Sequence, residues 1–505
     1  MTARAVMVLG TTSGAGKSWL TTALCRWYSR QGFRTAPFKA QNMSNNARIA
    51  QGLNGEPGEI GSAQYFQALA AGREPDVRMN PVLLKPERDT ASQIIVMGKV
   101  RDELRQIPWR ERSAHLWPQA RQALHQLMAD NDIVVIEGAG SPAEINLHDS
   151  DYVNMRTALE VSARCLIVTD IDRGGAFAHL YGTYQLLQPC EQALIAGFVL
   201  NRFRGDASLL APGPAQLEAL TGVPTVAVLP MWREHGLPEE DGLFDGFHPG
   251  QTQTRGQQAR AIAIVAYPHI SNLDEFQPLR QADSVHLSWV RDAQSIAQAD
   301  WIILPGSKDT VADLAWLKAS GLDSAIMQHV DAGKPLLGVC GGLQILGRAI
   351  GDPSSNDTAA AGDALGLLPF STAFSEFKKL RQADLGFGTT TDCWSALSAV
   401  QWRGYEIHHG HHEPHDETLG RHAVLYNNTH GEPCGWQSGN TLGIYAHGLF
   451  ESPEVMQALF GHAHQSLDSV FDGLADYIEQ HFESALLQSL VCDGATGIQS
   501  HHLLR

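Results

Sequence analysis

Residues 6–24 read VMVLGTTSGAGKSWLTTAL, an apolar run followed by a glycine-rich loop and a helix-like stretch. A buried strand, a loop and a helix in this order are typical of a phosphate-binding loop. Gly14 and Gly16 allow backbone N–H groups to turn toward an anion, and the helix N-terminus adds its partial positive charge. We expect Lys17 to reach terminal phosphates and Ser18 to bind Mg²⁺. The loop carries one residue more than the strict Walker pattern.

Short apolar runs alternate with helical stretches through the first half of the chain. This alternation predicts the α/β class, with a parallel sheet flanked by helices and ligands at the carboxyl ends of the strands. The apolar runs that we expect to be strands are residues 5–9, 132–136, 165–169, 194–200 and 225–228.

Several polar residues near strand ends are candidates for the nucleotide and its metal. Glu137 ends the run IVVIE, and a carboxylate at this place commonly faces the nucleotide's Mg²⁺, although it can also be a surface residue before a turn. Asn201 could contact the adenine of ATP, but asparagine also often simply ends a strand. Glu59, Asp149 and Asp151 are weaker candidates for contacts with the metal or an intermediate.

The second half contains a glycine-flanked cysteine. Residues 335–342 read PLLGVCGG before a helix-like stretch, which is the cysteine form of a nucleophile elbow. A tight turn exposes the Cys340 thiol, whereas most single cysteines are buried small hydrophobes. We expect the Gly341 N–H to face an oxyanion, with a second donor at Gly306 in the turn LPGS. His447 lies just past a strand-like run and is the predicted base.

The histidine-rich run EIHHGHHEPH at residues 406–415 invites a metal hypothesis. Its histidines lack the spacing of a recognisable metal-binding motif, and they have no cysteine or carboxylate partners in such a geometry. We therefore interpret this run as a polar loop that borders the active site.

With both motifs in place, the chain resembles the cobyric acid synthase family of cobalamin biosynthesis over nearly its whole length. The run most specific for this resemblance is PFKAQNMSNN at residues 37–46, and the phosphate loop is similar to that of dethiobiotin synthetase. Further matching runs are NPVLLKP (80–86), EGAGSPAEINL (137–147), TDIDRGG (169–175) and GYEIH (404–408).

The resemblance implies a dethiobiotin-synthetase-like domain followed by a class I glutamine amidotransferase-like α/β domain. It implies ATP- and glutamine-dependent amidation of adenosylcobyrinic acid a,c-diamide at its b, d, e and g carboxylates. Lys39 resembles the second lysine of the dethiobiotin synthetase site, which would hold the substrate carboxylate. The class I family usually has His-Pro-Glu, whereas Gly448 and Leu449 follow His447. We therefore expect a Cys340–His447 dyad.

The length of 505 residues predicts two domains and a tail. We place an ATP-binding amidoligase domain at residues 1–245, a linker rich in glycine and glutamine at 246–258, and the glutamine amidotransferase domain at 259–452. A mostly helical tail is expected at 453–505.

The net charge of −17 argues against binding to nucleic acid or to an acidic membrane. No run is long and apolar enough to cross a bilayer, and the N-terminus lacks the pattern of a signal peptide. The seven cysteines show no paired spacing, which favours the reducing cytoplasm. The expected ligands are glutamine, ATP, Mg²⁺ and a corrinoid, and the oligomeric state stays open.

Three other functions remain open at this point. A sibling amidotransferase such as cobyrinic acid a,c-diamide synthase would use the same two chemistries on other carboxylates. A switch ATPase similar to ParA or MinD would account for the phosphate loop but leave GVCGG and YAHGLF unexplained. An inactive glutaminase-like half could serve as a scaffold.

Overall fold

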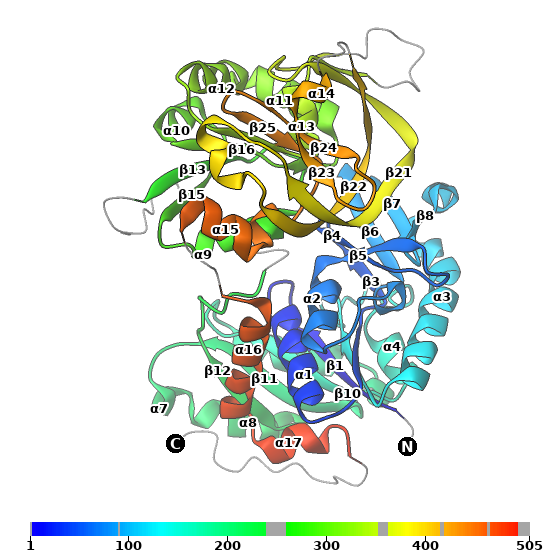
Figure 1. Ribbon diagram of the computed structural model, residues 1–505. Coiled ribbons are helices and arrows are strands. Elements are labelled where there is room, and N and C mark those ends of the chain that lie inside the picture. The colour runs from blue at the N-terminus through cyan, green and yellow to red at the C-terminus, as the bar shows by residue number, and fades with distance from the viewer. Residues whose placement is uncertain are drawn as a thin grey trace. The chain divides into compact units, whose positions relative to one another are not determined.

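The computed structural model describes residues 3–88, 91–238, 259–351, 362–414, 419–461 and 465–492 (Figure 1). The chain forms two compact units. Unit 1 comprises Met1–Ser44, Ala50–Leu237 and Ser466–Arg505, and unit 2 comprises Asn45–Ile49 and Pro238–Gln465. The predicted linker at 246–258 lies outside the described residues.

Unit 1 is built on a six-stranded sheet with the order β12-β11-β10-β1-β9-β2. Every neighbouring pair is parallel, as the alternation of strands and helices predicts. The strands are β1 (Arg4–Gly10), β2 (Thr35–Phe38), β9 (Ile133–Glu137), β10 (Arg164–Asp170), β11 (Ile195–Phe203) and β12 (Thr225–Pro230).

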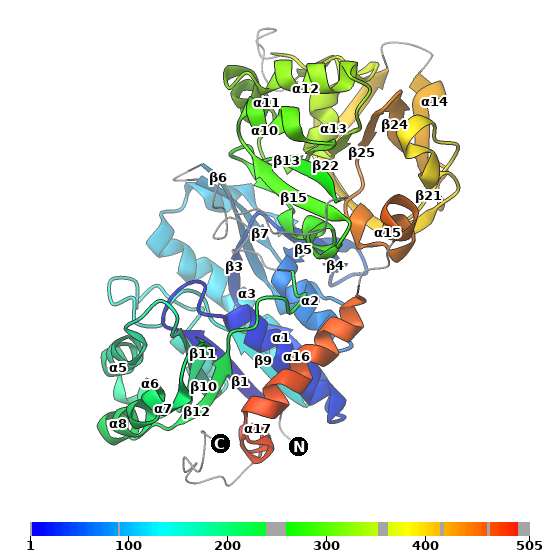
Figure 2. The same cartoon turned by 90° about the vertical axis from the view of Figure 1, so that its left-hand side faces the viewer.

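Helices cover both faces of this sheet (Figure 2). Val6 and Val8 of β1 pack on one side while Met7 and Leu9 pack on the other, because successive residues of a strand point to opposite faces. The first face is covered by α1 (Lys17–Arg30), α2 (Ser62–Ala70), α16 (Leu467–His481) and α17 (Ser484–Ser489). The second is covered by α3 (Trp109–Asp130), α4 (Met155–Glu160), α5 (Ala176–Leu186) and α8 (Pro212–Thr221).

The C-terminal helices α16 and α17 complete the core of unit 1. Arg26 Nε of α1 donates to Asp472 Oδ1 of α16 at 2.8 Å, and Tyr28 Oη donates to the Leu487 carbonyl at 2.8 Å. The sequence led us to expect a mostly helical tail at 453–505. The residues described there form α15 (Pro453–Phe460), which belongs to unit 2, and α16 and α17, which belong to unit 1.

Smaller elements surround the main sheet of unit 1. A four-stranded sheet has the order β3-β6-β7-β8, and β4 begins in unit 2 and ends in unit 1. The strands are β3 (Gln41–Met43), β4 (Ala47–Gln51), β5 (Pro57–Gly61), β6 (Val82–Arg88), β7 (Ala91–Val96) and β8 (Lys99–Val100). The short helices are η1 (Val77–Met79), η2 (Asp102–Gln106), α6 (Pro189–Gln192) and α7 (Ala207–Leu210).

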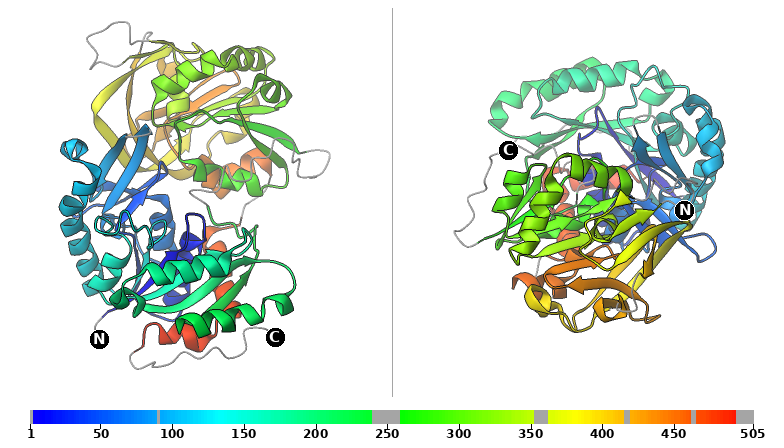
Figure 3. Two further views of the ribbon diagram at one scale, coloured as in Figure 1. Left: turned by 180° about the vertical axis from the view of Figure 1, so that it is seen from behind. Right: turned by 90° about the horizontal axis from the view of Figure 1, so that it is seen from above.

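Unit 2 contains a mixed sheet, which Figure 3 shows from two further sides. Its strand order is β15-β13-β16-β18-β25-β24-β23-β21-β19-β20, and β22 pairs with β21. The first five strands are parallel. They are β13 (Arg260–Val265), β15 (Val285–Val290), β16 (Trp301–Leu304), β18 (Leu336–Val339) and β25 (Thr441–Ile444). The others are β19 (Ala349–Gly351), β20 (Gly362–Asp363), β21 (Phe370–Phe387), β22 (Gln401–Pro414), β23 (Ala423–Asn427) and β24 (Pro433–Ser438).

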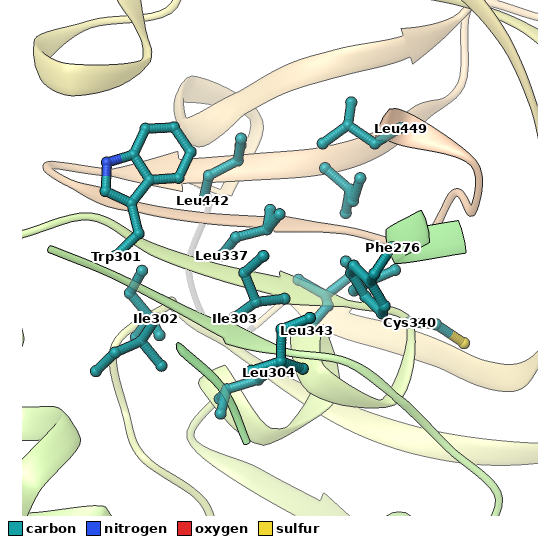
Figure 4. Close-up of a cluster of buried hydrophobic side chains, with 14 of the residues drawn as sticks. Phe276, Trp301, Ile302, Ile303, Leu304, Leu337, Cys340, Leu343, Leu442 and Leu449 are labelled. Carbon is teal, nitrogen blue, oxygen red and sulfur yellow. The ribbon is translucent and has the colours of Figure 1, made fainter. Parts of the chain in front are cut away.

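The carboxyl ends of the parallel strands in unit 2 carry the residues predicted to react. Figure 4 shows Cys340 at the edge of the buried cluster formed by these strands, with its sulfur directed away from the cluster. Other elements of this unit are β14 (Ile270–Ser271), β17 (Gly306–Ser307), η3 (Leu273–Phe276), α9 (Gln277–Gln281), α10 (Ala293–Gln298), α11 (Thr310–Ala319), α12 (Leu322–Asp331), α13 (Gly341–Leu346), η5 (Asp392–Leu397), α14 (Leu419–His422) and η6 (Leu449–Glu451).

The predicted α/β class is confirmed in both units. Within the part of the chain that the structure describes, no helix has both the length and the apolar character needed to cross a membrane.

Candidate functional site

Cys340 occupies a sharp turn between β18 and α13. Its φ of 51° and ψ of −105° are unusual for a residue other than glycine, and such a conformation costs on the order of 1–3 kcal/mol. The glycines around it permit close packing. A Cβ atom on Gly342 would lie 1.9 Å from the Leu304 carbonyl oxygen, and one on Gly338 would lie 2.8 Å from the Gly342 carbonyl. The predicted nucleophile elbow is therefore present.

The buried His447 follows β25 and forms a side-chain hydrogen bond with Cys340. Its Nδ1 lies 2.9 Å from Oε1 of Glu275, and the other oxygen of Glu275 accepts the N–H of Gly448 at 3.0 Å. Thiol, imidazole and carboxylate thus lie in series. This arrangement adds to the expected dyad a third residue, which is in place to orient the histidine.

The sequence analysis missed Glu275 because it lies 172 positions from His447 and outside the motif in which class I enzymes carry their glutamate. It belongs to η3, where it adjoins Asp274, and both carboxylates are only 1% exposed. Two adjacent acids in the otherwise apolar run NLDEF are the signal that could have indicated a buried polar role.

Electrostatics favour a protonated His447. Burial alone would lower the pKa of this imidazole, but Glu275 and Cys340 beside it raise the pKa to about 10. An imidazolium between two anions is the arrangement expected of a thiolate–imidazolium pair. His447 can therefore hold a proton at neutral pH and give it to a leaving group.

The two glycines predicted as oxyanion donors lie beside this pair. A Cβ atom on Gly306 would be 3.2 Å from Cε1 of His447, and one on Gly341 would be 2.7 Å from the amide nitrogen of Ser307. Neither position has room for a side chain without a shift of its neighbours. Their role as donors stays a prediction.

The histidine-rich run is part of strand β22 and not a loop, so our interpretation of it was wrong. The rings of His408 and His412 stack on Tyr445 with centroids 3.9 and 4.7 Å away, and His408 Nε2 lies 3.1 Å from Glu406. Among the described residues, no group of three or more histidine, cysteine or acidic side chains is arranged to hold a metal ion. His415 lies outside the described residues.

In unit 1, Glu137 is a hub of hydrogen bonds at the end of β9. Its Oε1 accepts from Ser18 Oγ and from Lys39 Nζ, both at 2.8 Å, and its Oε2 accepts from Gln67 Nε2 at 2.5 Å. Burial would raise the pKa of this carboxyl, but Lys39, Gln67 and Ser18 together lower it below its usual range. The structure thus brings three predicted residues together and adds Gln67.

The phosphate loop has the backbone geometry that its glycines predict. Gly14 and Gly16 have φ values of 72° and 100°, and Lys17 Nζ donates to the carbonyls of Thr12 at 2.9 Å and Gly140 at 3.1 Å. Asn201 donates from its side-chain amide to the Ala15 carbonyl at 2.9 Å. This residue therefore braces the loop, while its predicted contact with adenine stays untested.

Three weaker candidates lie in different surroundings. Glu59 is buried and forms an ion pair with Lys85. Asp149 is fully exposed, and Asp151 Oδ1 accepts the N–H of Val153 at 2.8 Å.

Asp151 also lines a cavity of about 320 Å³. Its wall includes Gln41, Trp109, Arg112, Gly140 and Tyr152. Since the Gly140 carbonyl accepts from Lys17, this cavity begins next to the phosphate loop.

Comparison with known proteins gives matches over both halves of the chain. Residues 6–239 match the CobQ/CobB/MinD/ParA nucleotide binding domain, and residues 261–455 match the CobB/CobQ-like glutamine amidotransferase domain. The cobyric acid synthase of Methylibium petroleiphilum is 63% identical over 98% of both chains, and that of Leptothrix cholodnii is 62% identical over 97% of both.

Proposed function

Because this chain belongs to the cobyric acid synthase family and is a glutamine-dependent amidotransferase ligase, we propose that it makes adenosylcobyric acid from adenosylcobyrinic acid a,c-diamide. It does so by amidating the b, d, e and g carboxylates with ATP, Mg²⁺ and glutamine. The observation that carries the proposal is that the chain is 63% identical to a cobyric acid synthase over nearly its full length. The chain also keeps the residues of both sites, around Cys340 and around Glu137.

In unit 2 the Cys340 thiolate attacks the carboxamide carbon of glutamine. His447 gives its proton to the departing nitrogen, so that ammonia leaves and a thioester remains, which water then hydrolyses to glutamate. Glu275 accepts from Nδ1 and keeps the other ring nitrogen toward the thiol. The N–H groups of Gly306 and Gly341 stabilise the oxyanion.

In unit 1 a substrate carboxylate attacks the γ-phosphate of ATP and becomes an acyl phosphate, with ADP as the leaving group. Ammonia then displaces inorganic phosphate and forms the amide. Lys17 neutralises charge on the transferring phosphoryl group, and Asn201 holds the loop in shape. Lys39, which is 7% exposed and bonded to Glu137, is placed to bind the incoming carboxylate.

The residues at this site fit a magnesium ion. The Ser18 hydroxyl and the Glu137 carboxylate are oxygen donors 2.8 Å apart, and Mg²⁺ prefers such oxygen ligands. Ser18 and Glu137 would hold the ion, which would supply positive charge to offset the charge of the transferring phosphoryl group. Glu59, the other predicted metal ligand, forms an ion pair with Lys85, and its role stays a prediction.

The substrate is tested by incubating the protein with adenosylcobyrinic acid a,c-diamide, MgATP and glutamine and following the corrinoid by mass spectrometry. Four successive conversions of carboxylate to amide are expected. A parallel reaction contains cobyrinic acid, the substrate of the sibling a,c-diamide synthase. Amidation of cobyrinic acid alone would refute the proposed substrate while leaving the two chemistries in place.

The raised pKa of His447 predicts how glutamine hydrolysis depends on pH. We expect kcat/KM to stay level through neutral pH and to fall as the pH approaches 10, because His447 then loses the proton that it must donate. In Glu275→Gln the charge that raises the pKa is gone, so the fall should begin at lower pH. Glutamate release measured from about pH 6 to pH 11 checks both profiles.

The same shift makes a prediction for stability. The pKa of His447 is higher in the folded chain than the ordinary value of 6.5, so its protonation stabilises the fold fully below that value. The contribution is lost as the pH rises through about 10. The free energy of unfolding is measured against pH for the wild type and for Glu275→Gln. The same pH dependence in both proteins would contradict the role of this carboxylate.

A further inference from the structure

The short segment Asn45–Ile49 belongs to unit 2, although the residues on both sides of it belong to unit 1. Arg48 in this segment is 2% exposed, and its guanidinium is held by two carboxylates of unit 2. Nε donates to Asp274 Oδ2 at 3.1 Å, and Nη1 donates to Glu451 Oε2 at 2.9 Å. A buried cation is tolerated only with such partners, so the position of Arg48 is closely fixed.

Arg48 also contacts the aromatic ring that stacks on His447. Its Cζ lies 4.9 Å from the centroid of the Tyr405 ring, and this ring stacks on His447 with centroids 5.2 Å apart at 20°. The backbones are joined as well, since His447 N donates to the Tyr405 carbonyl at 2.8 Å. The cation–π contact and the stack therefore fix the face of the imidazole.

The same segment holds the turn that carries Glu275. Asn46 Oδ1 accepts the N–H of Leu273 at 2.9 Å, and Asn272 Oδ1 accepts the N–H of Ala47 at 3.1 Å. Asn272 has a φ of 54°, and its amide nitrogen lies 3.3 Å from each ring nitrogen of His447. Residues 46–48 thus fix the turn that contacts the edge of the imidazole.

We propose that Arg48 is a positioning residue for glutamine hydrolysis. Arg48 acts on His447 by two routes, through the ring of Tyr405 and through the turn 272–275. The inference rests on the proposed glutaminase function of Cys340 and His447. It assigns part of the glutaminase machinery to a segment far outside residues 261–455, the range that matches the glutamine amidotransferase domain.

The test compares Arg48→Met, which removes the charge and keeps a long side chain, with Arg48→Lys. We expect Arg48→Met to lower kcat for glutamine hydrolysis about 10²-fold, the size of effect that a misplaced catalytic group produces. KM for glutamine should change less than about twofold, because ground-state binding is untouched. Arg48→Lys should recover part of the loss, since it keeps the charge without the planar fork.

Two controls separate positioning from a loss of folded protein. Arg260→Met removes a comparable contact in unit 2, because the Arg260 guanidinium lies 5.7 Å from the Trp301 ring, at the amino ends of the strands and away from Cys340. It should keep the wild-type kcat. The fraction of chains in which 6-diazo-5-oxonorleucine labels Cys340 should be the same in Arg48→Met as in the wild type. Amidation driven by ammonium should also be unchanged.

A double-mutant cycle with Glu275→Gln tests the route. If Arg48 acts by positioning His447, the losses in kcat do not multiply, and the double variant resembles Glu275→Gln. The inference would be overturned by any of three results. These are losses in kcat that multiply in the double variant, a wild-type kcat in Arg48→Met, and a fall in labelled sites that matches the fall in activity. A wild-type protein that releases no glutamate would overturn the proposed function with it, whereas an unaffected Arg48→Met overturns this inference alone.

Discussion

Cys340→Ala is expected to lose glutamine-driven amidation by at least about 10³-fold and to keep the wild-type rate with ammonium. The thiolate forms the covalent bond that releases ammonia, and no other group in the Cys340–His447–Glu275 series can replace it. Formation of the acyl phosphate uses residues of unit 1 and does not need Cys340. Added ammonia therefore replaces the ammonia that the variant cannot release from glutamine. The rates are measured by mass spectrometry of the corrinoid with each nitrogen source.

A matched control is available in the same unit. Cys434 in β24 is buried like Cys340 but is assigned no chemistry, so Cys434→Ala should amidate with glutamine at close to the wild-type rate. If Cys340→Ala used glutamine as well as the wild type does, Cys340 would not be the nucleophile of glutamine hydrolysis. If it failed with ammonium too, the substitution would have damaged the fold and the assignment would lack support.

Lys17→Met is expected to show the opposite pattern, with amidation reduced about 10²- to 10³-fold whichever nitrogen source is supplied. The Lys17 ammonium at the phosphate loop can stabilise the negative charge on the transferring phosphoryl group. A methionine of similar length carries no charge and cannot do so. Glutamine hydrolysis should remain measurable, because Cys340 and His447 are untouched. Release of ADP and of glutamate, followed in parallel, gives the two rates.

Lys99→Met serves as the control for removal of a lysine from unit 1. Lys99 is 64% exposed and pairs with Glu56 at the surface, so its loss should leave both rates unchanged. Ammonium-driven amidation by Lys17→Met at the wild-type rate would show that the loop has no role in activating the carboxylate.

The parts of both sites that could be predicted from sequence are those encoded locally. The phosphate loop and the elbow at Cys340 each need a strand, glycines and a helix within about fifteen residues, and those neighbours are visible in the chain. Glu137 and His447 were found because each lies at the end of an apolar run, whereas Lys39 was found through the resemblance to dethiobiotin synthetase. The parallel order of strands in unit 1 followed from the alternation of elements in the same way.

The remainder depends on contacts between residues that are distant in the chain. Glu275 and Gln67 carry no motif, and only the fold brings them to His447 and Glu137. The run at 406–415 was misinterpreted because histidines that stack on Tyr445 look polar in sequence, yet they alternate along a strand. The sequence did not indicate where the helices of the tail pack, because an amphipathic helix does not reveal which apolar face it will cover.

The return of α16 to unit 1 has a consequence for the order in which the chain is made. The apolar face of α1 emerges early from the ribosome, but Asp472, which binds Arg26, follows 446 residues later. At about 10 residues per second, the interval is on the order of 40 s. Through that interval the part of the α1 surface that packs against α16 stays uncovered, and Arg48 is followed by Asp274 after 226 residues and by Glu451 after 403. Its native state is reached after translation ends, and chaperones that bind exposed apolar segments have their opportunity throughout that interval.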